Sequence, residues 1–301
     1  MAGPARASRI NGTVQSSAIR SVLGWLLMAV AGAGAGAAPA LMVDVYAHRG
    51  GAGLAPENTL TAFRHALVLK ADVLELDVHA SRDGEIVVLH DFTLSRTARV
   101  TGYVREMTLT ELKRLDVGVW FDPRFANERI PTLREVLDLV KASDDPRVRL
   151  SIETKYPSPG EAPAPPVDFE ERVLQLVRTA GLLDRVIVQS FFYPSIVRVK
   201  TLAPAVRTAA LRASRAPTSD PVAVVREAKA DAWAPQAGMV TRETVDALHQ
   251  AGIPITPWTV NAPAEMERLI DAGVGRLRGD GIITDYPDRL IQVLRARGAR
   301  P

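Results

Sequence analysis

The sequence predicts an α/β protein built as a TIM (β/α)8 barrel with a small insertion after the second strand. Apolar, β-rich runs alternate with amphipathic stretches along residues 43–297, and there are eight of each. Apolar strands that alternate with helices are typical of a parallel sheet that helices cover on its outer face. Beyond an unusual N-terminal segment the chain keeps about 260 residues, which is close to the usual length of one such barrel.

The predicted strands are rich in Val, Ile and Leu, and the predicted helices repeat apolar residues every three or four positions. The strands span residues 43–48, 73–78, 149–153, 185–189, 208–211, 232–235, 253–260 and 282–284. The helices span residues 59–70, 133–141, 169–180, 195–202, 222–230, 241–251, 263–272 and 288–297.

The connection after the second predicted strand has about fifty residues, far more than a usual loop. Residues 82–85 read Arg-Asp-Gly-Glu, which is typical of a hairpin turn, and they lead into an apolar run at 86–90. Thr108 and Glu111 have the spacing of a capping box, which predicts a short helix through Leu115. The insertion therefore covers about residues 91–131, and connections of this length are often functional.

The first 40 residues differ in composition from the rest of the chain. Their only charges are on Arg6, Arg9 and Arg20, and residues 21–40 carry none. A basic start, an apolar run and small residues up to Ala40 are typical of a secretory signal peptide. Alternatively, residues 21–40 are retained and tether the protein to a membrane, since about 20 residues can span a bilayer. Either form predicts export, to the periplasm or outside the cell, of a barrel domain at residues 41–301.

The charge balance argues against a nucleic-acid partner. Without the three N-terminal arginines, the 37 basic residues become 34, which equals the 34 acidic residues. The barrel region is therefore formally neutral and has no basic stripe, so it lacks the electrostatic footprint of a nucleic-acid-binding protein. The chain has no cysteine, which excludes disulfides, thiolate metal sites and a cysteine nucleophile.

Acidic side chains gather at the ends of the second and third predicted strands. Glu75 and Asp77 are two positions apart and share one face of their strand, and Glu153 and Lys155 share a face in the same way. In a (β/α)8 barrel the catalytic groups lie at the carboxyl ends of the strands, where these residues are found. Three carboxylates without any cysteine predict a hard divalent cation, Mg²⁺ or Ca²⁺.

Two histidines complete this group. His48 and Arg49 end the first predicted strand, and His90 ends the run after the hairpin. Histidine titrates near neutral pH, so one of His48 and His90 can act as the base and the other as the acid in the hydrolysis of a phosphodiester. The cation and Arg49 would neutralise the phosphoryl oxygens. With Lys155 included, the charges of the site balance when an anionic phosphodiester is bound.

Nine short motifs follow one another in order from residue 48 to residue 287. They read His48-Arg49-Gly50, Pro56-Glu57-Asn58-Thr59, Glu75-Leu76-Asp77-Val78, Asp83-Gly84, His90-Asp91, Glu153-Thr154-Lys155, Gln189-Ser190-Phe191, Trp258-Thr259-Val260-Asn261 and Gly281-Ile282-Ile283-Thr284-Asp285-Tyr286-Pro287. Each motif alone is weak, but together and in this order they resemble the glycerophosphodiester phosphodiesterase family.

The resemblance implies a TIM barrel with a small insertion and an enzyme that hydrolyses glycerophosphodiesters to sn-glycerol 3-phosphate and an alcohol. The residues it implies are Glu75, Asp77 and Glu153 for the metal, His48 and His90 for acid–base catalysis, Arg49 and Lys155 for the phosphate, and Trp258 for the substrate side of the pocket. Three matters stay open: the alcohol released, the choice between Mg²⁺ and Ca²⁺, and whether water attacks directly or a substrate hydroxyl first forms a cyclic phosphate.

Two other functions fit the same barrel. A lysophospholipase D-like enzyme would act on lipids with one acyl chain and would need an apolar groove near Trp258 and the insertion. A non-catalytic glycerophosphodiester-binding protein would be expected to lack a histidine or a carboxylate of the site, and all are present. Residues 276–280 and the Pro-rich residues 156–167 depart from the family pattern, and we expect either segment to alter the access of a leaving group.

The remaining polar candidates have weaker assignments. His65 and His249 fall in predicted helices and receive no role. His79 shares a strand face with the two carboxylates, so it either belongs to the site or supports it by a hydrogen bond. Glu57 either contacts the site or orders the start of the helix after Asn58, and we favour the second interpretation.

Overall fold

The computed structural model describes residues 41–143, 145–213 and 220–300. The predicted signal peptide or membrane segment at residues 1–40 lies outside this part of the chain. Within the part that is described, no helix combines the length and the apolar character needed to cross a bilayer.

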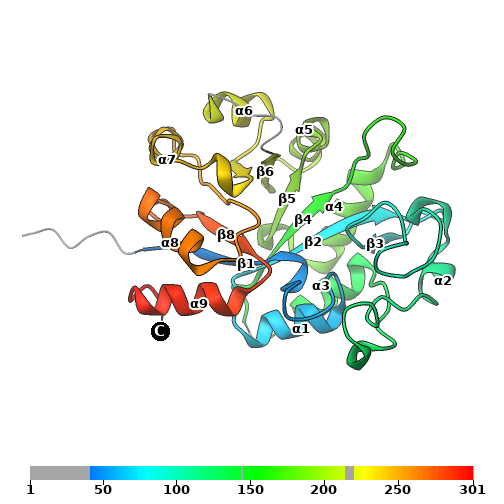
Figure 1. Ribbon diagram of the computed structural model, residues 1–301. Helices are drawn as coiled ribbons and strands as arrows, with labels where there is room; N and C mark the ends of the chain where they lie inside the picture. The colour runs from blue at the N-terminus through cyan, green and yellow to red at the C-terminus, as the bar shows by residue number, and fades with distance from the viewer. Residues whose placement is uncertain (1–40, 144, 214–219, 301) are drawn as a thin grey trace, which may run out of the picture. The chain divides into compact units, whose positions relative to one another are not determined.

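The centre of the fold is a curled sheet of parallel strands, which helices cover on the outside (Figure 1). The hydrogen-bonded order of the parallel strands is β7-β6-β5-β4-β2-β1-β8, and β3 pairs antiparallel with β2. Their bounds are β1 Asp44–Ala47, β2 Val73–Ala80, β3 Ile86–Val88, β4 Arg149–Thr154, β5 Val186–Ser190, β6 Arg207–Arg212, β7 Ala232–Pro235 and β8 Gly281–Thr284. The predicted fold class and the predicted hairpin after the second strand are confirmed.

The prediction of a regular strand at residues 253–260 is wrong. The segment forms only isolated bridges, one of them to Trp233, because Pro254 and Pro257 have no N–H to donate to a ladder. It still lies between the two edge strands: the Trp233 N–H donates to the Pro254 carbonyl at 3.0 Å, and the Ile283 N–H donates to the Pro257 carbonyl at 3.0 Å. This irregular segment therefore closes the barrel between β7 and β8.

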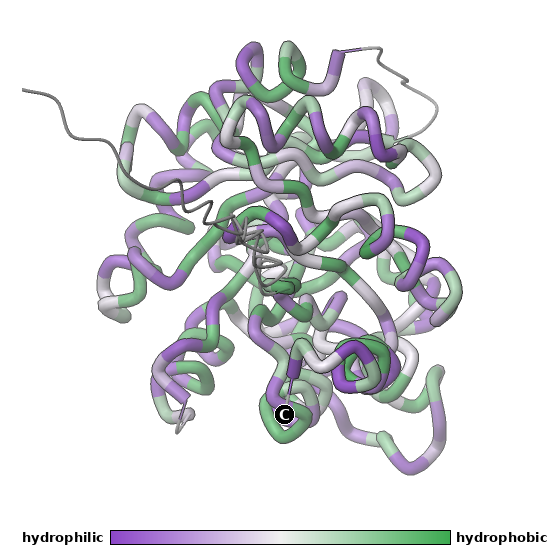
Figure 2. The backbone as a smooth tube through the Cα atoms, turned by 90° about the vertical axis from the view of Figure 1, so that its left-hand side faces the viewer, coloured by the Kyte–Doolittle hydropathy of each residue, from purple (hydrophilic) through white to green (hydrophobic). Residues whose placement is uncertain are grey.

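The helices of the outer layer match the predicted amphipathic stretches closely. Their bounds are α1 Leu60–Val68, α3 Leu133–Lys141, α4 Phe169–Ala180, α5 Tyr193–Leu202, α6 Pro221–Glu227, α7 Arg242–Gln250, α8 Pro263–Ala272 and α9 Pro287–Ala296. Hydrophobic and hydrophilic residues alternate along them (Figure 2), and their apolar faces pack on the sheet in the main core. Thr132 and Thr241 begin α3 and α7 with capping boxes, so local sequence decides where these helices start.

The insertion has a small core of its own. It contains η2 (Val104–Glu106), α2 (Leu109–Leu112) and η3 (Pro123–Phe125), and Thr108 caps α2 with the predicted capping box to Glu111. The buried residues of this core are Leu94, Val104, Leu112, Val117 and Ile130, together with Val87 of β3 and Leu89, which precede the insertion. The insertion is therefore a packed unit, and its loops can be held at the mouth of the barrel.

Residues 276–280 lie directly before β8, at the amino ends of the strands. Arg278 and Gly279 line a hollow there with Asp44 and Arg149, which begin β1 and β4. A residue that precedes a parallel strand lies at the opposite edge of the barrel from the carboxyl ends. The prediction that this segment alters access for a leaving group at the carboxyl ends is therefore wrong.

The fully buried Asp280 joins the closing segment to β8. Its carboxylate accepts hydrogen bonds from the N–H of Ile255 at 3.0 Å and of Gly275 at 2.7 Å, and His249 Nε2 lies 2.9 Å away. We expect Asp280→Ala to lower the free energy of unfolding by about 3 kcal/mol or more, because it leaves buried N–H donors without an acceptor. Urea unfolding measures this.

The matched control for that prediction is Asp271→Ala. Asp271 has an exposed side chain and pairs with Arg297 on the surface, so its loss should cost at most about 1 kcal/mol. Equal unfolding midpoints for the two variants would show that Asp280 does not hold the barrel closed.

Candidate active site

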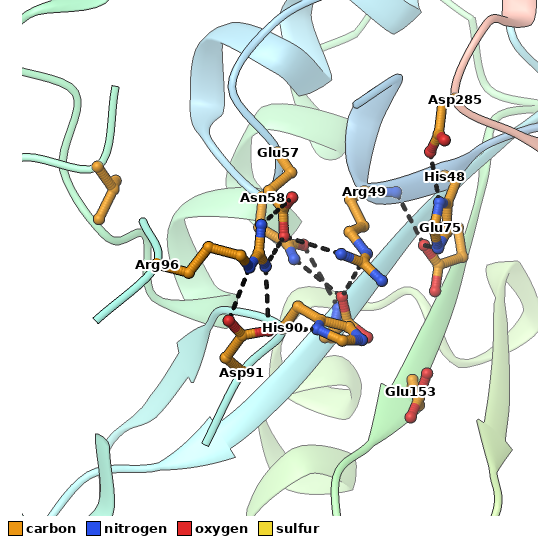
Figure 3. Close-up of polar contacts among 12 residues, drawn as sticks. His48, Arg49, Glu57, Asn58, Glu75, His90, Asp91, Arg96, Glu153 and Asp285 are labelled. Carbon is orange, nitrogen blue, oxygen red and sulfur yellow. Dashed lines mark hydrogen bonds and ion pairs between the residues drawn. The ribbon is translucent and has the colours of Figure 1, made fainter. Parts of the chain in front are cut away.

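The carboxyl ends of β1, β2 and β4 bring together four of the predicted site residues, which are His48, Arg49, Glu75 and Glu153 (Figure 3). β1 passes directly into the 3-10 turn η1 (His48–Gly50), which carries His48 and Arg49. In the parallel pairing of β2 with β4, Asp77 lies beside Glu153. The strand parity read from the sequence therefore places the side chains as expected.

Three carboxylates form a buried cluster at this edge. Glu75 is 1 % exposed, Asp77 1 % and Glu153 8 %, and one oxygen of each lies within 4.8 Å of the others. Burial, together with the neighbouring carboxylates, raises the pKa of Glu75 well above its usual value. Burial also raises the pKa of Glu153, although Lys155 opposes it. The cluster thus carries more negative charge than its surroundings compensate, and its hard oxygen donors fit a divalent cation such as Mg²⁺ or Ca²⁺.

Neutral donors hold two of these carboxylates in place. Gln189 Nε2 donates to Glu75 Oε1 at 2.9 Å, and the Arg49 N–H donates to Glu75 Oε2 at 2.8 Å. Asn58 Nδ2 donates to Asp77 Oδ2 at 2.8 Å. The Glu75 and Asp77 side chains are therefore oriented by Gln189 of β5, by the backbone of Arg49 in η1 and by Asn58, which precedes the N-cap residue of α1.

Two cationic side chains border the cluster. Lys155 Nζ lies 2.8 Å from Glu153 Oε1 and 3.4 Å from Asp77 Oδ1. Arg49 Nε lies 3.6 Å from Asp77 Oδ2, and among the described residues this buried atom has no hydrogen-bond partner. Burial works against the ionised form of Asp77, but Lys155, His90 and Arg49 outweigh it and lower its pKa. The Arg49 Nε atom therefore faces the Asp77 carboxylate inside the site at ion-pair distance.

His48 is paired with the carboxylate of Asp285, which is distant from it in the sequence. Its Nδ1 donates to Asp285 Oδ1 at 2.6 Å, and Asn261 Nδ2 donates to Asp285 Oδ2 at 2.7 Å. Nε2 then lies on the other side of the ring, 4.0 Å from Glu75 Oε2. Burial lowers the pKa of His48 although the hydrogen bond to Asp285 opposes it. The pair therefore leaves Nε2 as the proton-accepting atom.

His90 repeats this arrangement on the opposite side of the mouth. Its Nδ1 donates to Asp91 Oδ1 at 2.6 Å, and its side chain is 32 % exposed. In each histidine, Nδ1 is bound to an aspartate, and Nε2 is not bound to that aspartate. Such pairs orient an imidazole for proton transfer.

The structure decides between the open interpretations of Glu57 and His79. The favoured interpretation of Glu57 is wrong: Thr59 caps α1, whereas Glu57 binds Arg49 and Arg96. His79 is a supporting residue, since its Nε2 lies 3.2 Å from the His90 carbonyl oxygen. Burial, with a smaller effect of Lys155, lowers the pKa of His79 to about 4, so this ring is neutral near pH 7.

Aromatic side chains line a large cavity beside the polar cluster. The cavity has a volume of about 1000 Å³. Tyr156 and Phe192 stack with their ring centres 4.5 Å apart, and Phe191 meets the edge of Trp258 at 5.5 Å. The same cavity is lined by His90, Glu153 and Lys155. The Pro-rich loop contributes Tyr156, Ser158 and Glu161, so this segment borders the same cavity as His90.

Sequence reasoning missed three charged residues of the site. Asp285 and Asp91 each stand within one of the nine motifs, but the sequence does not show which residue either of them contacts. Arg96 lies outside the motifs, and it binds both Asp91 and Glu57. A carboxylate directly after a histidine, as in His90-Asp91, was the one local signal for such a pair.

Known proteins share this architecture and these motifs. The model of the glycerophosphoryl diester phosphodiesterase family matches residues 48–289. A glycerophosphodiester phosphodiesterase of Caldanaerobacter subterraneus is 38% identical over 259 residues, which cover 84% of this chain and 98% of that protein. One of Bacillus subtilis is 34% identical, with 80% of this chain and 83% of that protein covered.

Solved structures show the same fold. A Silicibacter pomeroyi protein described as a glycerophosphoryl diester phosphodiesterase superposes with a TM-score of 0.77 at 31% identity, covering 86% of this chain and 95% of that one. An Oleispira antarctica phosphodiesterase in complex with the product sn-glycerol-3-phosphate superposes with a TM-score of 0.74 at 26% identity, covering 84% of this chain and 97% of that one. The prediction of an enzyme is confirmed. The chain belongs to the glycerophosphoryl diester phosphodiesterase family.

Proposed function

We propose that the protein hydrolyses glycerophosphodiesters to sn-glycerol 3-phosphate and an alcohol in a metal-dependent reaction with His48 and His90 as the acid–base pair. The observation that carries this proposal is the pair of carboxylate-oriented histidines that flank a buried cluster of three carboxylates. The product bound to the related Oleispira antarctica phosphodiesterase supports the substrate class.

Glu75, Asp77 and Glu153 would hold the cation. When bound, Mg²⁺ or Ca²⁺ supplies positive charge that stabilises the phosphoryl oxygens and lowers the pKa of a coordinated hydroxyl. Arg49 and Lys155 lie against the same carboxylates and would donate hydrogen bonds to the phosphate. Their charges would then be shared between the carboxylates and the substrate, which favours binding of an anion.

The two histidines divide the proton transfers between them. One takes the proton of the attacking hydroxyl on Nε2, and the other gives a proton from Nε2 to the leaving oxygen. Asp285 and Asp91 keep the proton on Nδ1 of their histidine and stabilise the ring when it becomes cationic. Trp258 would contact the substrate at the aromatic side of the cavity.

The substitution Asp285→Asn tests whether the orientation of the His48 ring contributes to catalysis independently of metal binding. We expect kcat to fall on the order of 100-fold, because an amide no longer favours the Nδ1-protonated ring and does not stabilise its cation. Bound metal should be unchanged, since Asp285 is not among the proposed ligands. Steady-state kinetics with glycerophosphocholine and metal analysis measure the two effects.

Asp138→Asn is the control for this substitution, because it makes the same chemical change at an exposed residue of the outer helix α3. A kcat for Asp285→Asn within twofold of that control would show that Asp285 does not orient a catalytic histidine.

One observation favours a second candidate, a lysophospholipase D-like reaction. Phe191 and Phe192 are 46% and 44% exposed at the cavity, although large apolar side chains usually avoid water. The cavity volume of about 1000 Å³ is at the upper end for small-molecule sites, about 300–1,000 Å³. A substrate with one acyl chain would cover these aromatic rings.

The test uses the full chain with glycerophosphocholine and with lysophosphatidylcholine, each with and without a chelator. Release of sn-glycerol 3-phosphate from the water-soluble diester that stops with chelator and returns with Mg²⁺ or Ca²⁺ is the expected result. Choline release from the lysolipid alone would replace the leading proposal with the second. Release that resists the chelator would overturn metal dependence, and inactivity on both substrates would overturn the proposed substrate class.

We also propose that the protein is exported, which rests on the uncharged segment at residues 21–40. Cleavage after Ala40 would give a mature protein that begins at Leu41, whereas a retained segment would leave the full chain with the membrane fraction. Mass spectrometry of the protein from fractionated cells distinguishes the two. Full-length protein in the cytosolic fraction would contradict both.

A further inference from the structure

Arg96 of the insertion forms two ion pairs at the mouth of the barrel. Its Nε and Nη2 donate to Asp91 Oδ2 and Oδ1 at 2.7 and 3.0 Å. Its Nη1 and Nη2 donate to Glu57 Oε2 and Oε1 at 2.8 and 2.7 Å. One guanidinium therefore binds two carboxylates in the bidentate manner, one on the insertion and one on the loop before α1. Figure 3 shows Arg96 between them.

Each of these carboxylates holds a residue of the proposed mechanism. Asp91 Oδ1 accepts from His90 Nδ1 at 2.6 Å, and Glu57 Oε1 accepts from Arg49 Nη1 at 2.9 Å. Arg96 is thus the common partner in a chain of charges that runs from His90 to Arg49. The proton-transfer group and the phosphate-binding group are connected through it.

We propose that Arg96 is a positioning residue, which holds His90 and Arg49 in one fixed geometry through Asp91 and Glu57. The inference rests on the proposed function, since it takes the roles of His90 and Arg49 from it. It also assigns a role to the insertion, because the small core of that segment fixes the position of Arg96 at the mouth of the barrel.

The geometry requires an arginine. Only a planar guanidinium presents enough N–H groups in a fork to bind two carboxylates at once, and a lysine is a single point charge. Trp120 lies under the guanidinium at 5.5 Å from its ring centre and adds a cation–π contact. The Trp120 indole N–H donates to the Val117 carbonyl at 2.8 Å, so the insertion core fixes the ring on which Arg96 lies.

Burial explains why the link matters. Glu57 is only 7 % exposed, and a buried carboxylate is costly unless it is paired. Although burial opposes it, pairing with Arg96 and Arg49 lowers the pKa of Glu57. Without Arg96, Glu57 would keep Arg49 as its one arginine partner among the described residues, and Asp91 would be free to turn away from His90.

The first test compares Arg96→Ala, Arg96→Lys and the control Arg129→Ala in the full chain. Arg129 is an exposed residue of the same insertion that bonds to the Arg114 carbonyl. We expect kcat on glycerophosphocholine to fall on the order of 100-fold for both Arg96 variants and to stay unchanged for the control. Arg96→Lys keeps the positive charge, and it provides the test if Arg96→Ala does not fold. Millimolar guanidinium should restore part of the activity of Arg96→Ala.

The second test asks whether Arg96 acts through its two carboxylates. In a Glu57→Gln, Asp91→Asn background, adding Arg96→Ala should lower kcat by less than about twofold, because the links it supports are already broken. Losses that multiply would overturn the inference, and so would kcat values for the Arg96 variants within twofold of the wild type.

The third measurement does not depend on turnover. Nitrogen-15 NMR of the His90 ring, assigned with His90→Ala, should show the Nδ1-protonated form in the wild type and a mixture of tautomers in Arg96→Lys. If this change occurs in a protein inactive on glycerophosphodiesters, the positioning role stands and the proposed function fails. An unchanged His90 ring in an active protein would overturn the positioning role alone.

Discussion

Replacing His48 or His90 by alanine is expected to lower kcat on glycerophosphocholine by about 100-fold to 10,000-fold, the range that general acid–base catalysis supplies. Each ring has Nδ1 bound to a carboxylate, His48 to Asp285 and His90 to Asp91, at 2.6 Å. Neither carboxylate can take over the proton transfer at the position of Nε2. Steady-state kinetics over a range of pH values measures the loss.

The control for both histidine variants is His65→Ala. His65 lies within α1, away from the mouth of the barrel, and its replacement should leave kcat unchanged. Because one histidine acts as acid and the other as base, the kcat of the double variant should be only slightly below that of the less active single variant. Wild-type rates for either single variant would remove that histidine from the mechanism.

The second large effect concerns the carboxylate cluster. Glu75→Gln combined with Asp77→Asn should abolish stoichiometric binding of Mg²⁺ or Ca²⁺, because hard cations need the charged oxygens that these changes remove. We expect kcat to fall by at least about 1,000-fold, which corresponds to the several kcal/mol that a metal supplies to a phosphoryl transfer. Elemental analysis after dialysis and the rate with added metal measure the two quantities.

Glu265→Gln combined with Asp271→Asn is the matched control, since both residues belong to α8, where Glu265 pairs with Arg268 and Asp271 with Arg297 at the end of α9. It removes the same charge without touching the cluster. Stoichiometric metal retained by the Glu75 and Asp77 variant would mean that other residues bind the cation. Lost metal with an unchanged rate would mean that the reaction does not need it.

The helices show how much of this fold local sequence decides. α4 has the predicted bounds at residues 169–180, and α8 has those at 263–272. Their apolar spacing and terminal residues determine these bounds without reference to the rest of the chain. The segment at 253–260 shows the limit: its apolar residues predict a strand, but Pro254 and Pro257 leave it with isolated bridges.

Glu57 shows a different limit. Its position just before a helix suggested a local role, and Thr59 performs that role instead. Glu57 pairs with Arg96, which is 39 residues away in the chain. No periodic pattern marks such a pair, because the two residues meet only after the insertion has packed against the mouth of the barrel.

What could be read from the chain alone was therefore the set of elements and the face on which each strand side chain lies. Backbone geometry makes Glu75 and Asp77 neighbours on one side of β2 in any sheet. Their convergence with Glu153 needs only that β2 and β4 be adjacent, which the barrel order supplies.

The pairing of charges was decided by the tertiary structure. Asp285 reaches His48 across 237 residues, because closure of the barrel brings the end of β8 beside the end of β1. A hydrogen bond depends on positions correct to a few tenths of an ångström, and only the packed barrel sets those positions.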